Sequence, residues 1–236
     1  MKKYFLSSFL MMVSSLAMAQ REAGKFSIIP RVGVTLANLS GDAIYTSSSM
    51  SDALEFKSRY KAGLVCGVDF DYQLSQQLSL GLGAAYSQQG CRYGNDKTQT
   101  SVEGEVYNYL GFSNASTQLH YLNIPLMVNF YLTDNFAVKA GVQVGINLSG
   151  KLKYSETPYS VNEDGDVVYE KQIDYNLDTN SKKVDISIPV GVSYEYEKVI
   201  IDARYNIGLT RTSEIEDIKG SKNQVFQFTV GYRFTL

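Results

Sequence analysis

Charged residues of both signs stand at the polar positions of several segments in which polar and apolar residues alternate. In these segments polar and apolar residues alternate, so that a strand would place all the charges on one face. Because an unpaired charge in a closed interior is strongly destabilising, we predict structural ion pairs, with a proton or solute path as the functional alternative. The predicted lumen charge network consists of Arg31, Lys61, Asp69, Asp71, Lys139, Asp185, Glu195, Asp202, Arg204 and Arg233.

The chain has one histidine, His120, and it is the candidate for catalysis at a lipid-facing rim. Ser116 and Thr117 are close to it in sequence, and a histidine beside a hydroxyl is the pairing that activates a nucleophile. No nucleophile elbow, HExxH motif or Cys/His metal cluster accompanies it. We therefore predict no catalytic residue, no cofactor and no enzymatic activity, and we keep a lipid-modifying barrel enzyme as the alternative.

An acidic run, Glu163, Asp164 and Asp166 around Gly165, has the oxygen ligands that a hard cation such as calcium prefers. The run lacks the full ligand spacing of a calcium loop. We predict a plain acidic turn and no metal site.

Two cysteines, Cys66 and Cys91, could form a disulfide in an exported protein. If residues 61–72 and 77–92 form a hairpin, Cys66 lies opposite the region of Ala84 and Cys91 lies near Arg59. This separation exceeds the Cα distance of about 4.4 to 6.8 Å that a disulfide allows. We predict two free thiols, with Cys66 on the outer face.

Eight alternating segments predict eight β-strands that must position these residues. Each is longer than a usual strand of about five or six residues, and a tilted strand of about nine to eleven residues crosses the hydrocarbon of a bilayer. The predicted strands cover residues 26–40, 58–72, 77–92, 117–132, 136–152, 183–196, 199–212 and 223–236.

The connections alternate between long and short, so that all long ones lie at one end. The long ones are 41–57, 93–116, 153–182 and 213–222, and the short ones are 73–76, 133–135 and 197–198. This layout predicts an all-β fold, an eight-stranded antiparallel transmembrane β-barrel with long extracellular loops and short periplasmic turns. A barrel of this size has a lumen that side chains fill.

Three prolines inside the predicted strands, Pro30, Pro125 and Pro189, conflict with a continuous hydrogen-bond ladder. We expect them at bulges or where the missing donor faces the lumen.

The N-terminus is typical of a secretory signal peptide. Lys2 and Lys3 precede a short apolar run, and residues 17–19 form a small-residue cleavage site. We predict a signal peptide at 1–19 and one outer-membrane barrel domain at 20–236. The formal net charge is -2, so no basic surface points to nucleic acid.

Three stretches also carry a family resemblance. They are HYLNIPLMVNFYL from His120, DISIPVGVSYEY from Asp185 with DARY following from Asp202, and VFQFTVGYRF from Val225. They resemble the outer-membrane β-barrel family of Bacteroidetes that includes PorT-like proteins. The resemblance implies a location in the bacterial outer membrane and a small barrel, and Pro125 and Pro189 match the family pattern. It also suggests a C-terminal barrel-insertion signal at Tyr232, Phe234 and Leu236, where a final leucine departs from the frequent phenylalanine.

These observations predict a small non-enzymatic outer-membrane protein with a filled lumen. It would act through its extracellular loops or as a component of the envelope or of a secretion system, and a narrow pore is a further alternative. The expected partners are outer-membrane lipid and lipopolysaccharide, the barrel-assembly machinery during insertion, and an envelope protein; no nucleic acid is expected.

Overall fold

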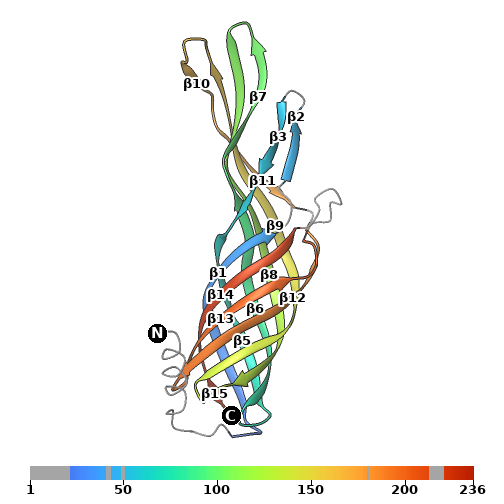
Figure 1. Ribbon diagram of the computed structural model, residues 1–236, viewed down its shortest axis with the longest axis vertical. Coiled ribbons are helices and arrows are strands. Elements are labelled where there is room, and N and C mark those ends of the chain that lie inside the picture. Colours follow the sequence, from blue (N-terminus) through green and yellow to red (C-terminus); the bar gives the residue numbers. More distant parts are fainter. Residues whose placement is uncertain (1–21, 41–43, 49–50, 180, 213–220) are drawn as a thin grey trace, which may run out of the picture.

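A closed ring of eight antiparallel strands forms the body of the protein (Figure 1). The computed structural model describes residues 22–40, 44–48, 51–179, 181–212 and 221–236. Each strand of the ring pairs with its neighbours in sequence, and the ring closes where β1 pairs with β14. The strands are β1 (Phe26–Ser40), β5 (Lys61–Gln73), β6 (Leu78–Tyr93), β8 (Val106–Tyr131), β9 (Phe136–Val161), β12 (Val184–Tyr196), β13 (Val199–Gly208) and β14 (Lys222–Tyr232). The predicted eight-stranded barrel is confirmed.

The surrounding bilayer explains why the ring of strands is closed. Inside a bilayer no water can satisfy a free strand edge, so a spanning sheet must pair its first strand with its last. Here Val34 of β1 lies opposite Phe228 of β14 and Leu64 of β5, and the short strand β15 (Phe234–Thr235) extends the pairing with β1.

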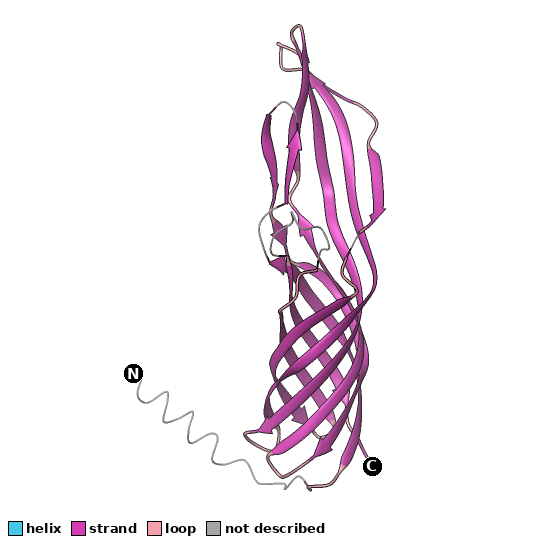
Figure 2. Ribbon diagram, turned by 90° about the vertical axis from the view of Figure 1, so that its right-hand side faces the viewer, coloured by secondary structure: helices cyan, strands magenta, loops and turns pink. Residues whose placement is uncertain are grey.

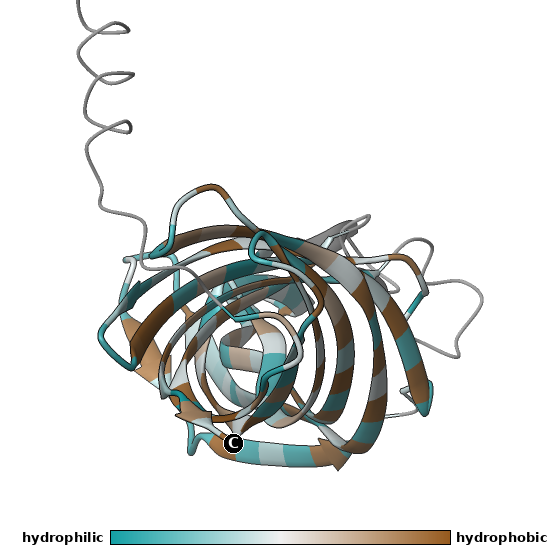
Figure 3. Cartoon of the chain, turned by 90° about the horizontal axis from the view of Figure 1, so that it is seen from below, coloured by the Kyte–Doolittle hydropathy of each residue, from teal (hydrophilic) through white to brown (hydrophobic). Residues whose placement is uncertain are grey.

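Alternation gives the barrel an apolar exterior and a polar interior. Val34, Leu64 and Phe228 are exposed on the outside, whereas Thr35 and Thr229 are buried inside. Seen along the barrel, apolar and polar bands alternate on the strands (Figure 3). The exterior therefore suits lipid and the interior holds the polar groups.

Above the ring, β8 and β9 continue far beyond the other strands (Figures 1 and 2). β7 (Asp96–Glu103) pairs with β8, and both β10 (Val167–Tyr169) and β11 (Ile173–Asp178) pair with β9. These segments form an extracellular sheet, which we define as β7, residues 106–113 of β8, residues 153–161 of β9, β10 and β11. A separate hairpin, β2 (Ile44–Ser48) with β3 (Ser51–Phe56), and the short β4 (Ser58–Arg59) complete the strands.

The extracellular sheet corrects two predicted loops. Residues 93–116 and 153–182 were predicted as long connections outside the strands, but much of each is strand. The sequence did not predict these strands because their alternation lacks the strong apolar parity of a lipid-facing strand. Residues 213–220 of the fourth predicted loop lie outside the described residues, and β13 ends at Gly208 rather than at Thr212.

The three prolines interrupt the ladder without changing its register. Pro125 stands in a gap between the pairs Leu82 with Leu126 and Ala85 with Asn123. Pro189 and Pro30 stand in similar two-residue gaps of the β9–β12 and the β1–β14/β15 pairings. The expected bulges are therefore not at the prolines. Register shifts occur instead in the β8–β9 pairing, between Ser113 and Ser116 and between His120 and Tyr121, and in the β7–β8 pairing, between Gln99 and Ser101.

Both cysteines are free, as predicted. Cys66 is exposed and lies opposite Tyr86, while Cys91 is buried opposite Thr117. The predicted signal peptide at 1–19 lies outside the described residues. Among the described residues, none belongs to a helix long and apolar enough to cross a membrane.

Candidate functional site: the lumen network and the extracellular sheet

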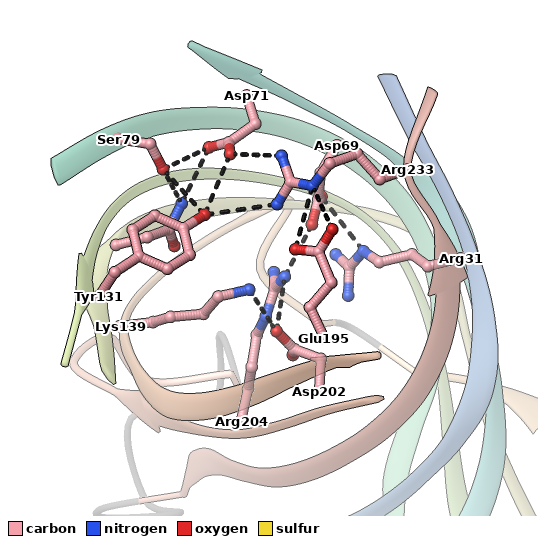
Figure 4. Close-up of polar contacts among 11 residues, drawn as sticks. Arg31, Asp69, Asp71, Ser79, Tyr131, Lys139, Glu195, Asp202, Arg204 and Arg233 are labelled. Carbon is pink, nitrogen blue, oxygen red and sulfur yellow. Dashed lines mark hydrogen bonds and ion pairs between the residues drawn. The ribbon is translucent and has the colours of Figure 1, made fainter. Parts of the chain in front are cut away.

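The first part of the lumen network is a chain of five charged side chains across the barrel (Figure 4). Arg31 Nε lies 3.1 Å from Asp69 Oδ1, and Arg204 Nη2 lies 2.7 Å from Asp69 Oδ2. Arg204 Nε also donates to Asp202 Oδ1 at 2.6 Å, and Lys139 Nζ reaches Asp202 Oδ2 at 2.5 Å. Asp69 and Asp202 thus each hold two cations.

A second cluster is centred on Arg233. Its Nη1 lies 3.0 Å from Asp71 Oδ2 and its Nε lies 3.0 Å from Glu195 Oε1. Neutral groups complete the cluster: Asn129 Nδ2 and Ser79 Oγ donate to Asp71 Oδ1 at 2.9 and 2.8 Å. Asp71 therefore has a cation on one oxygen and neutral donors on the other.

The two clusters balance in charge. Four cations, Arg31, Lys139, Arg204 and Arg233, meet four carboxylates, Asp69, Asp71, Glu195 and Asp202. A cavity of about 20 Å³ lies among these side chains, which is room for about one water molecule. In this part of the barrel the lumen is filled by ion pairs.

Two predicted members lie apart from these clusters. Lys61 is half-buried and makes no ion pair with any other described residue. Asp185 is buried and accepts hydrogen bonds from Thr210 Oγ1 at 2.5 Å and Asn223 Nδ2 at 3.1 Å, both neutral donors. The structure therefore brings together eight of the ten predicted residues.

Sequence reasoning missed the neutral members of the network. Tyr131 accepts a hydrogen bond from Arg233 Nη2 at 3.3 Å, and the Tyr121 hydroxyl accepts one from Asn223. Both tyrosines stand on the inward parity of β8, one residue from the outward Phe130 and Leu122. That parity was the available signal, because a tyrosine that points into a polar lumen needs a hydrogen-bond partner.

His120 lies at the outer end of the barrel wall. Its Nδ1 is 2.6 Å from the Tyr86 hydroxyl, and the two rings stack with centroids 5.9 Å apart. Ser116 and Thr117 lie further along β8, opposite Arg92 and Cys91. The partner of His120 in the structure is thus a phenol rather than either of these hydroxyls.

The acidic run is the turn between β9 and β10. Asp166 N donates to Asn162 Oδ1 at 2.8 Å, and Gly165 has a positive φ of 84°, a conformation that suits glycine. Among the described residues no group of three or more His, Cys, Asp or Glu side chains has an arrangement that could hold a metal ion.

Aromatic rings follow each other across the extracellular sheet. Tyr109 of β8 stacks on Tyr159 of β9 at 5.2 Å between centroids, and Tyr159 contacts Tyr169 of β10 at 5.4 Å. On the other face, Tyr154 stacks on Tyr175 of β11 at 4.9 Å. A hydrogen bond to the Glu156 carboxylate raises the pKa of the Tyr175 phenol above its ordinary value.

The residues predicted as an insertion signal lie at the end of the last barrel strand. Tyr232, Phe234 and Leu236 are all exposed, and the rings of Tyr232 and Phe234 are 4.8 Å apart. Arg233 between them points into the lumen network. Their role in insertion stays a prediction.

The closed ring, its apolar exterior and its internal ion pairs define a small transmembrane β-barrel protein. Residues 18–214 match the family model described as outer membrane protein beta-barrel domain. The chain therefore belongs to this family, and it resides in the bacterial outer membrane.

Several solved outer-membrane protein structures are similar to this chain at low identity. The attachment invasion locus protein Ail of Yersinia pestis is 10% identical over 90% of this chain and 100% of its own, with a TM-score of 0.39. Neisserial surface protein A is 12% identical over 89% and 97%, with a TM-score of 0.40. The outer membrane protease OmpT of Escherichia coli is 12% identical over 94% and 99%, with a TM-score of 0.41. Likeness at this level carries no information on activity or ligand. A comparison with curated protein sequences gives no match.

Proposed function

We propose that this protein is a non-enzymatic outer-membrane barrel that anchors and presents its extracellular sheet. The observation that carries the proposal is the contrast between a lumen filled by balanced ion pairs, with a cavity of about 20 Å³, and the extracellular sheet of five strand segments held above it. Function often resides in segments that a rigid frame holds in place.

The filled lumen supports a closed barrel over a narrow pore. Purified protein in a planar bilayer is expected to give no large open steps. An Arg204→Ala variant is the comparison, since it removes the side chain that joins Asp69 to Asp202. Large, frequent open steps of the unaltered protein would contradict a closed lumen.

The extracellular sheet supports a role in contacts outside the cell, with an envelope protein as the partner. The test is crosslinking in intact envelopes with the full chain and with a variant in which residues 96–113 and 154–178 are replaced by short turns. The variant is expected to fold as a barrel and to lose the captured partner. Equal capture by both would contradict a role for the sheet.

The finer family assignment is also part of the proposal. The YLNIPL, DARY and GYRF sequences support a PorT-like protein of Bacteroidetes, exported with removal of residues 1–19, and a place in the envelope or in a secretion system. Insertion would use the barrel-assembly machinery and the terminal Tyr232, Phe234 and Leu236, with lipopolysaccharide and lipid around the exterior. Mass spectrometry of the mature N-terminus tests the export step, since it should begin at Gln20.

The absence of enzymatic activity is proposed from the surroundings of His120. Its Nδ1 is hydrogen-bonded to the Tyr86 hydroxyl. A catalytic arrangement needs a nucleophile beside the histidine and a third group that orients the ring, and the Ser116 and Thr117 hydroxyls are not the partners of His120. If envelopes containing the protein modified lipid, and His120→Ala abolished that reaction, the proposal would fail.

A further inference from the structure

One face of the extracellular sheet carries two adjacent apolar rows. Val102, Tyr107 and Val167 belong to the row nearer the tips, in which Val161 stands between Tyr107 and Val167. Tyr109, Tyr159 and Tyr169 belong to the next row, and its member on β7 is the polar Gln99. Residues directly opposite each other in paired strands point to the same face. We call Val102, Tyr107, Tyr109, Tyr159, Val167 and Tyr169 the tyrosine face.

The tyrosine face lies on the side of the sheet that continues the lipid-facing exterior, because one bulge in β8 and one in β9 each shift the alternation by one residue. It is nevertheless in water. Residues Phe136–Asn147 of β9 already suffice to cross a bilayer, and Tyr159 stands twelve residues beyond Asn147, roughly 40 Å along an extended strand.

The tyrosine face remains accessible in the folded chain. Val102, Tyr107, Val167 and Tyr169 are 49%, 41%, 44% and 68% exposed. A contiguous exposed apolar patch on a soluble surface marks an interaction site, and tyrosine gives a rigid, amphipathic contact area at low entropic cost.

The opposite face of the same strands is more polar. On that face, Ser101, Asn108 and Ser160 stand at the level between the two apolar rows, together with the exposed Val168, and Asn108 Nδ2 donates to Ser101 Oγ at 3.0 Å. What distinguishes the tyrosine face is its four rings, since Tyr107, Tyr109, Tyr159 and Tyr169 all point to the same side.

The turns beside the tyrosine face are acidic. Glu103 and Glu105 stand at the β7–β8 turn, and Glu163, Asp164 and Asp166 stand at the β9–β10 turn. The segments 98–116 and 154–170 contain no Lys or Arg. A basic partner would therefore complement the charge around the apolar rows.

A lysine of the chain itself contacts the row of Tyr109, Tyr159 and Tyr169. Lys97 Nζ lies over the ring of Tyr109, 5.5 Å from its centroid, which is within the range of a cation–π contact. Tyr169, at the other end of the row, is the most exposed of the three rings and offers the same chemistry to an incoming ammonium or guanidinium group.

We propose that the tyrosine face binds an extended protein segment in which Lys or Arg alternates with apolar residues. The apolar side chains would pack on the two rows, and the cations would reach the tyrosine rings and the acidic turns. This inference rests on the proposed role of the extracellular sheet and names the partner class for it.

A second copy of this chain fits less well. Four strands about 4.8 Å apart and two rows about 7 Å apart give roughly 300 Å² on each partner, far below the roughly 800 Å² of a stable interface. Two copies would also bring their acidic turns together.

The test measures binding of a fluorescent peptide that alternates Lys and Val to the full chain in lipid nanodiscs. A peptide that alternates Glu and Val is the charge control. The double variant Tyr159→Ser/Tyr169→Ser should weaken binding of the Lys peptide about tenfold or more, since central aromatic residues dominate such contacts. Val168→Ser is the matched control, because Val168 lies between Val167 and Tyr169, is 63% exposed and points to the other face.

A charge variant, Glu105→Gln/Glu163→Gln/Asp164→Asn, should also weaken binding and reduce its dependence on salt. Equal binding of the Lys and Glu peptides, or equal affinities of the tyrosine and Val168 variants, would overturn the proposal. Three other results would also overturn the proposal. They are a loss of binding in the charge variant alone, binding of neutral oligosaccharides in place of the peptide, and a dimer of the protein in nanodiscs. Retained resistance to unfolding in gels would show that each variant folds.

Failure here is distinguishable from failure of the proposed function. If the Lys peptide does not bind but replacement of residues 96–113 and 154–178 still abolishes partner capture, the sheet acts through another chemistry. If replacement leaves capture unchanged, the proposed function itself fails.

Discussion

The barrel and the extracellular sheet are built from the same two long strands, β8 and β9, yet they meet different solvents. In the barrel, outward residues such as Val142 and Leu126 face lipid, and inward charges pair with one another. In the sheet, the same side of the strands carries the tyrosine face, which meets water. The alternation that presents apolar side chains to lipid in the barrel thus presents an exposed apolar surface to water above the membrane.

The largest effect that separates the two regions should come from removing the central cation of the lumen. Arg204→Ala leaves Asp69 and Asp202 with one cation each in a buried site. We expect a loss of about 3 to 5 kcal/mol in the free energy of unfolding, as for other broken buried pairs. Urea-dependent unfolding from lipid vesicles measures it. The exposed Arg211→Ala is the control, and equal losses in the two variants would show that the network does not stabilise the barrel.

The same substitution on the two outward surfaces should have different effects. Val142→Lys places a charge in the lipid-facing wall and should cost about 2 to 4 kcal/mol in the same unfolding experiment. Val167→Lys, on the tyrosine face, should change stability by less than about 0.5 kcal/mol, as other surface substitutions do. Similar values at both positions would contradict the assignment of lipid to one region and water to the other.

Packing should also differ between the regions. At Gly83 of the barrel wall, an added methyl group would meet Pro125 Cγ and the Asp69 carboxylate, whereas at Gly111 of the sheet it would make ordinary contacts. Gly83→Ala should therefore cost about 1 to 3 kcal/mol of stability, and Gly111→Ala should be nearly neutral. The unfolding midpoints of the two variants measure the difference. Equal midpoints would show that the barrel wall is loosely packed at Gly83.

The smallest effect should sharpen the account of the lumen itself. Asp185 is held by neutral donors, so Asp185→Asn should cost only about 1 kcal/mol. Asp202→Asn removes a carboxylate between two cations and should cost about 3 kcal/mol. If the two variants unfold alike, the ion pairs contribute no more than ordinary hydrogen bonds.

Strand parity predicted the barrel and most of the lumen network, because a two-residue period fixes which side chains share a face. The alternation predicts whether a side chain points into the lumen, but it does not predict its position along the barrel axis. It therefore did not separate Lys61 and Asp185 from the other charged residues. It also did not predict the extracellular sheet. The bulges near Asn114 and His120 shift the alternation, and in water both faces of a strand tolerate polar residues.

The central claim is that one outward surface passes from lipid, at β9 in the barrel wall, to water, at β10 in the extracellular sheet. Nitroxide labels at positions 142 and 167, in a Cys66→Ser/Cys91→Ser background in nanodiscs, test it by accessibility to oxygen and to a water-soluble nickel reagent. We predict that the label at 142 is accessible to oxygen and shielded from nickel, and that the label at 167 is accessible to nickel. Nickel access at 142, or shielding from nickel at 167, would contradict the account.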